Sequence, residues 1–447
     1  MPASPSRITA FDILVRVERA HSFASELLHS ASYAKLSATD HALATELVMG
    51  VLRWRSKLDA QIAKVSSMPV MKLDLEVLTA LRLGSYQVGW LDRVPVRAAI
   101  HESVELVKHA RKRSAVPFAN AVLRKLAARE ARAGESYNAS ILTATSAKDL
   151  SETAAHPAWI IDRWVSQYGL QVARQICLYN QTIPTSTIRL RDSHAPTLLQ
   201  GEGVVLAPGE FLCSARQIFS GDVMQSGVLA ANQIAIQDEA SQLVAALVGR
   251  GKRILDCCAA PGGKTWSIAD RNPTSEVVAV EIHRHRAALL EKRVAANNVQ
   301  VISQDFLEFT DNESFDRVLC DVPCSGTGTI CRNPEIKWGL SRQDLRDLPV
   351  RQLALLKAAM RHVTPGGKLV YSTCSLEREE NESIVERALH NDSSFRVVPC
   401  LLELDRLRSE GELTLADATR AVHGVYLRTL PGVHRCDGFF AAILQRA

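Results

Sequence analysis

The sequence predicts a multidomain protein with an all-α front domain, a small α+β middle segment and an α/β domain with a mostly parallel sheet. Its 447 residues exceed the roughly 250–300 that one hydrophobic core accommodates. The first part of the chain carries only helical periodicity, whereas strand and helix patterns alternate after residue 252. We expect domains at residues 1–132, 156–236 and 237–447, with a linker at residues 133–155.

The front domain is predicted to be helical and basic. Ile100, Val104 and Val107 recur at the spacing of one helix face. Residues 1–132 hold 20 Lys and Arg against 12 Asp and Glu, a net charge of +8, whereas the whole chain carries +5. This distribution favours a polyanion-binding module, and an ordinary solvated basic surface remains the alternative. Arg111, Lys112 and Arg113 form the best candidate for a phosphate contact.

The middle of the chain changes character twice. Residues 133–155 are polar, alanine-rich and weakly patterned, which is typical of a linker. A helix is expected over residues 158–168, followed by short alternating stretches rich in Val, Leu and Gly. We therefore predict a small α+β module over residues 156–236.

The last region is predicted to be an open α/β sheet whose ligands bind beyond the carboxyl ends of its strands. A helix is expected to begin near Gln237 and to lead into it. Short apolar strands are expected at residues 253–257, 276–281, 300–303, 317–320 and 368–372.

A glycine-rich turn at residues 256–265 follows the first of these strands. Small residues let the backbone approach a ligand, and the following helix presents free N–H groups, which favours a nucleotide-like cofactor. A phosphate-binding P-loop is disfavoured because Cys258 stands where that motif requires glycine. Glu281 ends the second strand, where it could accept hydrogen bonds from ribose hydroxyls, and Asp305 follows the third, where it could meet an adenine amino group. Either carboxylate alone would more often be an ordinary surface group.

Two cysteines, Cys324 and Cys374, each stand at the carboxyl end of a predicted strand. Carbon 5 of cytosine is a poor nucleophile until a thiolate adds to carbon 6, so a cysteine in this position favours methyl transfer to a pyrimidine ring. Asp321 and Lys264 are the candidates for holding the base and favouring its protonation.

The remaining cysteines are interpreted as small buried hydrophobic residues or are left unassigned. We expect small buried hydrophobic side chains at Cys177, Cys213, Cys257, Cys320, Cys400 and Cys436. Cysteines 320, 324 and 331 and histidines 283 and 285 have no matching second half at zinc-site spacing, so no metal is predicted.

Residues 256–265, 321–338 and 372–375 resemble the signature motifs of the RNA cytosine-C5 methyltransferases, most closely the RsmB (Fmu/Sun) type that acts on 16S ribosomal RNA. The likeness extends over the whole chain: the front domain resembles the RNA-binding NusB domain, and residues 156–236 resemble the family's small α+β segment, which is implied to bind RNA. It implies a Rossmann-like class I methyltransferase domain that uses S-adenosylmethionine. It also implies that Cys374 is the nucleophile and that Cys324 assists proton removal and product release.

The resemblance further assigns contacts. The implied cofactor-binding residues are Cys258, Ala259, Ala260, Pro261, Gly262, Gly263, Lys264, Glu281, Asp305 and Asp321. Lys264 and Asp321 are implied to touch the target base as well, with the division between the two roles left open. Residues 332–338 are expected to border the RNA path, although Cys331 replaces the family's usual arginine.

The expected partner is small-subunit ribosomal RNA, with no DNA and no membrane, and the protein is expected to be a monomer. The target cytosine should be unpaired or flipped out. The start of the sequence shows no apolar run with a cleavage site, and cysteines without framework spacing suit a reducing compartment, so we expect a cytoplasmic protein. Two alternatives remain: a methyltransferase of transfer RNA or 23S ribosomal RNA, and an inactive RNA-binding assembly or antitermination factor.

Overall fold

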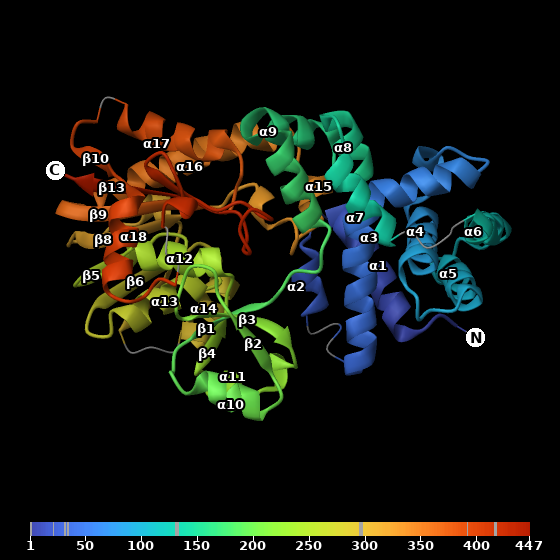
Figure 1. Cartoon of the computed structure of the whole chain (residues 1–447), viewed down its shortest axis with the longest axis horizontal. Coiled ribbons are helices and arrows are strands. Elements are labelled where there is room, and N and C mark those ends of the chain that lie inside the picture. Colours follow the sequence, from blue (N-terminus) through green and yellow to red (C-terminus); the bar gives the residue numbers. More distant parts are fainter. Residues whose placement is uncertain are drawn as a thin grey trace. The chain divides into compact units, whose positions relative to one another are not determined.

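The computed structural model describes residues 2–20, 22–30, 33, 35–129, 134–294, 298–390, 392–414 and 418–447. The chain divides into two compact units (Figure 1). Unit 1 comprises Met1–Ile183 together with Ile330–Leu340, and unit 2 comprises Pro184–Thr329 and Ser341–Ala447. A short segment from late in the sequence therefore folds with the N-terminal part of the chain.

Unit 1 is helical in the part that the structure describes. Its helices are α1 (Pro5–Ala20), α2 (Ala24–Leu28), α3 (Ala38–Val65), α4 (Leu75–Trp90), α5 (Val96–His109), α6 (Val116–Arg129), α7 (Gly134–Thr143), α8 (Ala147–Thr153), α9 (Ala158–Asn180) and α15 (Ile336–Gly339), with short 3-10 turns η1 (Val70–Lys72) and η2 (Arg113–Ala115). Leu47, Leu81 and Leu106 are fully buried in its core. Their burial agrees with the amphipathic pattern that predicted helices here.

The predicted linker at residues 133–155 is wrong where α7 and α8 form. Both helices pack against α9, and Ile141 and Leu150 are fully buried. The Ser146 side chain caps α8 by accepting a hydrogen bond from Asp149 N at 3.1 Å. Helix α9 also continues past the expected end at residue 168, through a break at Gly169 (φ +79°), and it belongs to unit 1 instead of the α+β segment.

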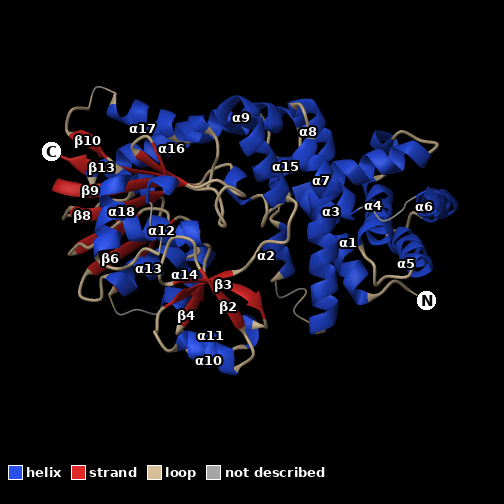
Figure 2. Cartoon of the chain, viewed as in Figure 1, coloured by secondary structure: helices blue, strands red, loops and turns tan. Residues whose placement is uncertain are grey.

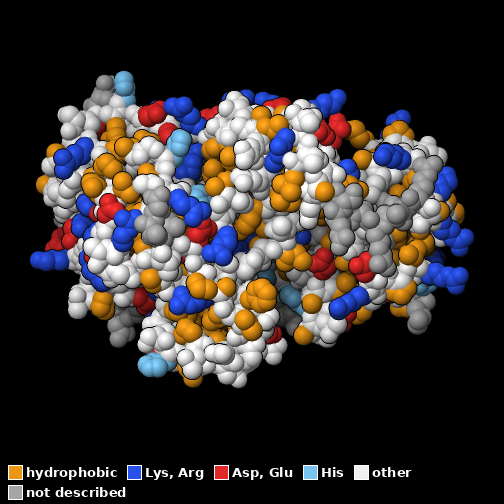
Figure 3. Space-filling view, in the orientation of Figure 1, with side chains coloured by type: hydrophobic (Ala, Val, Ile, Leu, Met, Phe, Trp, Pro, Cys, Tyr) orange, Lys and Arg blue, Asp and Glu red, His pale blue; other side chains and the backbone are white. Residues whose placement is uncertain are grey.

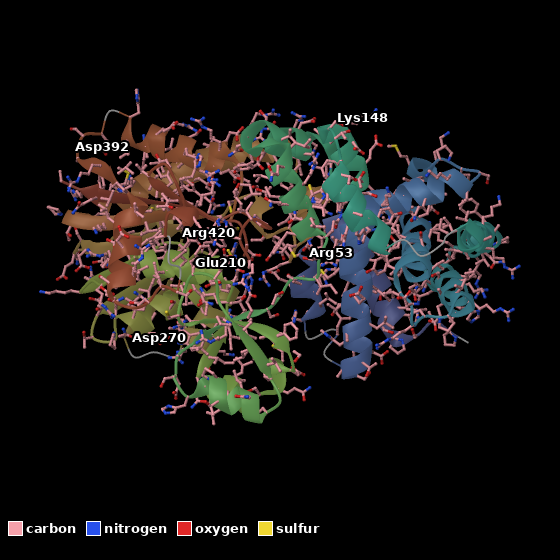
Figure 4. All side chains as sticks on the ribbon, in the orientation of Figure 1. Arg53, Lys148, Glu210, Asp270, Asp392 and Arg420 are labelled. Carbon is pink, nitrogen blue, oxygen red and sulfur yellow. The ribbon has the colours of Figure 1, made fainter. Side chains whose placement is uncertain are left out.

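The small α+β module consists of a four-stranded antiparallel sheet in the order β2-β3-β1-β4, with α10 (Ala195–Gly201), η3 (Val223–Gln225) and α11 (Gly227–Ala230). Its strands are β1 (Thr187–Leu190), β2 (Val205–Pro208), β3 (Ala215–Ser220) and β4 (Ile234–Ile236). Ion pairs join this module to the rest of unit 2. Arg189 and Arg191 both bind Asp270, at 2.6 and 2.7 Å, and Glu210 binds Arg420 at 3.2 Å (Figure 4).

The rest of unit 2 is built on a nine-stranded mixed sheet. Its strands are β5 (Arg253–Asp256), β6 (Glu276–Glu281), β7 (Val299–Ser303), β8 (Phe315–Asp321), β9 (Val363–Thr373), β10 (Phe395–Val398), β11 (Val422–His423), β12 (Tyr426–Arg428) and β13 (Phe440–Arg446). The order is β11-β12-β13-β9-β8-β5-β6-β7, and β10 also pairs with β13. Strands β9, β8, β5, β6 and β7 are parallel to one another, whereas β13 runs antiparallel to β9. The expected parallel core is present, with an antiparallel extension on one side.

Helices cover both faces of this sheet (Figure 2). They are α12 (Glu239–Leu247), α13 (Gly263–Arg271), α14 (Arg284–Val294), α16 (Asp344–Arg361), α17 (Glu382–Leu389) and α18 (Cys400–Ser409). Successive side chains of a strand lie on opposite faces of the sheet. Ile254 packs on the face covered by α12, α13 and α18, and Leu255 packs on the face covered by α16 and α17. Because both faces are buried, the central strands are continuous apolar runs, which is why they could be located from the sequence.

The described helices include none that is both long and apolar enough to cross a membrane. In the parallel part of the sheet all strands end at the same edge. That edge carries the glycine turn after β5, Glu281 at the end of β6, Asp305 after β7, and the two cysteine-bearing loops after β8 and β9.

Candidate active site

The glycine turn after β5 brings the backbone to the carboxyl edge of the sheet and starts α13. Gly262 adopts a left-handed conformation (φ +96°). A Cβ atom there would lie 3.2 Å from Leu290 Cγ on α14, so both the dihedral angle and the space favour glycine. The turn places Lys264 in the first helical turn of α13, at the sheet edge.

The two carboxylates predicted to contact a cofactor follow the neighbouring strands. Glu281 is 5% exposed, and its Oε1 atom accepts a hydrogen bond from His283 N at 2.8 Å. Asp305 caps the short turn η4 (Phe306–Glu308), where its Oδ1 atom accepts from Leu307 N at 3.0 Å. Both side chains therefore follow strands that end beside the glycine turn, where the sequence placed them.

The cysteine-bearing loops converge because of the register of β8 and β9. Asp321 pairs with Ser372 in the parallel ladder, and Cys324 and Cys374 lie three and two residues further on. Their Sγ atoms are 3.3 Å apart, and both side chains are partly exposed. The structure thus brings together two thiols that are 50 residues apart in the sequence.

Lys264 and Asp321 form an ion pair, with Nζ and Oδ2 2.7 Å apart. Ser372 Oγ donates to the other carboxylate oxygen of Asp321 at 2.6 Å, and Lys264 Nζ lies 4.9 Å from the centre of the Phe439 ring. Burial alone would lower the pKa of Lys264, but the Asp321 carboxylate and the nearby Cys374 raise it above its ordinary value. Lys264 is therefore a cation at neutral pH.

The two thiols are not equivalent. The hydrogen bond with Cys374 and burial raise the pKa of Cys324 well above its ordinary value, and the Glu380 carboxylate adds to this effect. Cys324 therefore retains its proton. The Lys264 ammonium interacts electrostatically with Cys374.

Cys258, in the glycine turn, is a neutral thiol. Burial raises its pKa well above the ordinary value, and the nearby Cys320, Asp256 and Asp321 raise it further. Of the cysteines interpreted as buried hydrophobic residues, five are buried, but Cys213 is exposed. Within the described part of the chain, no three His, Cys, Asp or Glu side chains gather in a way that could hold a metal ion.

Sequence reasoning missed Glu380, in the turn η6 (Arg378–Glu380) after β9. Its side chain is fully buried, and its carboxylate accepts hydrogen bonds from the residues that follow both Cys324 and Cys374. A glutamate in an acidic, polar stretch reads as a solvated side chain, so the sequence offers no signal for this role.

The segment expected to border the RNA path contains two buried charged residues. Glu335 is 7% exposed and accepts a hydrogen bond from Ala24 N at 2.7 Å. Lys337 is 1% exposed, and its Nζ atom donates to Arg53 O at 2.7 Å and to Ala155 O at 3.1 Å. The expectation is wrong for these two side chains, because they anchor the segment within unit 1. Cys331 is buried there as well.

Comparison with known proteins agrees with this architecture. The NusB family matches residues 4–128, and the family described as 16S rRNA methyltransferase RsmB/F matches residues 246–445. The probable ribosomal RNA small subunit methyltransferase B of Bacillus subtilis is 30% identical over 462 aligned positions, which cover all of both chains. This chain belongs to the RsmB/F family of 16S rRNA methyltransferases.

A second relative of this RsmB/F chain, the ribosomal RNA small subunit methyltransferase B of Vibrio cholerae, is 30% identical over 96% of the chain and 94% of the relative. The crystal structure of PH0851 has the same fold, with a TM-score of 0.78 and 21% identity over the whole of both chains. The expected family, and the expected combination of a NusB-like helical domain with a Rossmann-like methyltransferase domain, are confirmed.

Proposed function

We propose that this RsmB/F protein transfers a methyl group from S-adenosylmethionine to carbon 5 of one cytosine in 16S ribosomal RNA, in the cytoplasm and as a monomer. The observation that carries the proposal is the pair of thiols 3.3 Å apart beside the Lys264–Asp321 ion pair. A single buried cysteine would be explained by packing alone, whereas two thiols beside a fixed charge pair provide the groups that this reaction needs.

The residues at the sheet edge fit S-adenosylmethionine. Cys258 to Lys264 would lie along it, with Gly262 and Gly263 allowing close approach of the backbone. Glu281 offers a carboxylate for ribose hydroxyls, and Asp305 and Asp321 are placed further along the same edge. When bound, S-adenosylmethionine supplies the methyl group that carbon 5 receives.

In the proposed reaction, the Cys374 thiolate adds to carbon 6 of the cytosine, and the electrons of the double bond between carbons 5 and 6 move toward carbon 5. Asp321, held by Lys264 and Ser372, binds the ring and favours protonation of its nitrogen. After methylation Cys324, whose hydrogen bond with the Cys374 thiol is lost when Cys374 bonds the ring, takes the proton from carbon 5 directly or through a water molecule. The electrons of that C–H bond restore the double bond, and the bond between carbon 6 and Cys374 breaks with its electrons returning to the Cys374 sulfur. The 3.3 Å between the two Sγ atoms supports this role for Cys324.

Substrate RNA would be bound by basic side chains of unit 1 in addition to the two-cysteine site of unit 2. Figure 3 shows Lys and Arg side chains gathered at the end of unit 1 that α5 and α6 form. Arg111 and Arg113, between these helices, are exposed, whereas Lys112 pairs with Asp74 at 2.8 Å. We propose that the two arginines contact phosphates and that the pocket selects the cytosine.

The test is transfer of labelled methyl groups from S-adenosylmethionine to unmodified 16S ribosomal RNA, with bisulfite mapping and denaturing gels. Wild-type protein should methylate one cytosine. Cys374→Ala should abolish both methylation and protein–RNA adducts, whereas Cys324→Ala should accumulate a stable adduct. The exposed Cys213→Ala is the matched control and should behave as wild type.

Other outcomes would change the assignment. An adduct that persists without Cys374 and requires Cys324 would reverse the roles of the two cysteines. Transfer to transfer RNA or 23S ribosomal RNA instead would change the substrate. Binding of S-adenosylmethionine without transfer to any of these RNAs would favour an inactive RNA-binding factor.

A further inference from the structure

One buried carboxylate connects the two cysteine loops. Glu380 Oε1 accepts hydrogen bonds from Ser325 N at 2.9 Å and from Gln352 Nε2 at 2.8 Å. Its Oε2 atom accepts from the hydroxyl groups of Ser325 and Ser375. A carboxylate with no exposed surface needs several donors to offset its lost hydration, and here four donors provide them.

Two of the residues that donate to Glu380 lie next to the two cysteines in the sequence. Ser325 directly follows Cys324, and Ser375 directly follows Cys374. Gln352, on α16, also donates to the carbonyl oxygen of Pro323 at 3.0 Å, the residue before Cys324. The residue that follows each thiol is therefore bonded to the same carboxylate, Ser325 through its backbone N–H and its hydroxyl and Ser375 through its hydroxyl.

Other contacts also cross between the two loops: the hydroxyl oxygens of Ser325 and Ser375 lie 3.0 Å apart, and Leu376 N donates to Thr327 Oγ1 at 2.9 Å. Glu380 differs from them because its carboxylate also accepts a hydrogen bond from the backbone N–H of Ser325. The β8–β9 ladder ends at the pair Asp321 and Ser372, before either cysteine is reached. Asn381 binds Thr373 Oγ1 and Ser375 O, at 2.5 and 2.9 Å, but both lie on the Cys374 side. A backbone bond from Gly328 N to Cys374 O, at 2.9 Å, joins the loops four residues beyond Cys324.

We propose that Glu380 is a positioning residue that holds the Cys324 and Cys374 thiols together, so that Cys324 acts on the covalent intermediate formed by Cys374. This role rests on the proposed two-cysteine reaction. Of the two cysteines, only Cys374 is needed to form the covalent adduct with RNA. Breakdown of that adduct, which releases the methylated RNA, needs Cys324 to be held close to Cys374. Loss of the Glu380 contacts should therefore slow release of the RNA more than it slows attack.

The first measurement is the rate at which Cys324 and Cys374 form a disulfide, which depends on how closely the two thiols are held. It requires no RNA. Diamide takes two electrons and two protons from two adjacent thiols, leaving a disulfide and a hydrazine. In a Cys213→Ala background, diamide should link Cys324 to Cys374 rapidly, as detected by peptide mass spectrometry. Glu380→Ala should slow this linkage at least tenfold, whereas Glu380→Gln, which keeps the shape and can still bond the serines, should stay within about threefold of the parent.

The matched control is Glu386→Ala, which removes an exposed glutamate that pairs with Arg378 at 3.4 Å. It should leave the linkage rate unchanged. Thermal unfolding and S-adenosylmethionine binding check that Glu380→Ala is folded. If it is not, the double variant Ser325→Ala, Ser375→Ala removes two of the four donors and should slow the linkage instead.

The second measurement is the ratio of covalent RNA adduct to methylated product under single-turnover conditions. Glu380→Ala should raise this ratio at least fivefold, toward that of Cys324→Ala. Wild-type linkage and ratio in a folded Glu380→Ala would overturn the proposal, as would a wild-type protein that forms no Cys324–Cys374 disulfide. If wild-type protein methylates no RNA, the proposed function fails, but the linkage rates still decide whether Glu380 positions the thiols.

Discussion

At the scale of single residues, Asp256 lies beneath the glycine turn with almost no exposed surface. Burial raises its pKa to about 7, although a 2.7 Å hydrogen bond from Thr265 Oγ1 favours the charged form, and the nearby Asp321 raises the pKa further. The native protein therefore retains a proton on Asp256 that the unfolded chain has already released at mildly acidic pH.

This carboxyl should make the free energy of unfolding depend on pH. Its pKa is higher in the folded state, so its contribution is favourable at low pH and is lost as the pH rises from about 4 to about 7, by at most on the order of 4 kcal/mol. Asp256→Asn removes this dependence. Unfolding of wild type and variant between pH 5 and 8 should show the wild type losing stability relative to Asp256→Asn.

Asp405→Asn, at an exposed carboxylate that pairs with Arg408, serves as the control and should follow the wild-type curve. A constant difference between wild type and Asp256→Asn across this range would mean that Asp256 is ionised throughout.

The placement of single residues at the sheet edge was predictable where the residue type and its motif are informative. A single cysteine at the end of a buried strand is usually a small hydrophobic residue, so Cys324 and Cys374 stand out only as a pair within recognisable motifs, together with Lys264 in the glycine turn. Glu380 could not be found, because its role depends on four donors that only the folded chain brings to it. The prediction that Glu335 and Lys337 border the RNA path was wrong for the same reason. Long charged side chains are usually exposed, and the burial of these two depends on partners far away in the sequence.

At the scale of elements, the central strands could be located because they are short apolar runs buried on both faces. The expected strands at residues 253–257 and 276–281 match β5 and β6 to within one residue. Helices α7 and α8 were missed because alanine, serine and threonine give little contrast between a buried and an exposed face. Packing against α9 stabilises these two helices, although their own sequences show no clear apolar face.

The loop after β8 depends on a glycine. A Cβ atom on Gly328 would lie 2.1 Å from the Gly438 carbonyl oxygen, and Gly438 N donates to Gly328 O at 2.8 Å. Gly328→Ala should therefore displace the loop, cost roughly 1–3 kcal/mol of stability and reduce methylation more than tenfold. Thermal unfolding and methyl-transfer rates would measure the two effects.

Gly201→Ala is the matched control, because a Cβ atom there meets no atom within 4 Å. Methylation by Gly328→Ala at the wild-type rate would show that the loop tolerates displacement from Gly438.

At the scale of the whole molecule, unit 1 is not a continuous stretch of sequence. Residues Ile330–Leu340 complete it. Trp338 packs against its core and donates from Nε1 to Leu52 O at 2.6 Å, while Lys337 bonds two backbone carbonyl groups. The sequence placed a domain boundary near residue 132, and no local pattern reveals that a later segment returns to the first domain.

A fragment of residues 1–183 should therefore bind a synthetic peptide of residues 330–340. Binding to the folded state stabilises it, by about 2.7 kcal/mol when the free peptide is at 100 times its Kd. We expect the peptide to raise the Tm of the fragment in a concentration-dependent way and a peptide with Trp338→Ala to have little effect. A fragment whose Tm is unchanged by either peptide would show that its core is complete without the segment.

The return of residues Ile330–Leu340 to the first unit also sets an order of events during synthesis. The growing chain reaches this segment only after some 150 residues of the second unit have been made. Until then the nascent NusB-like part exposes the surface that Trp338 and Lys337 later cover. Unit 1, although most of it is translated first, is thus complete only after residues 184–329 of unit 2 have been made.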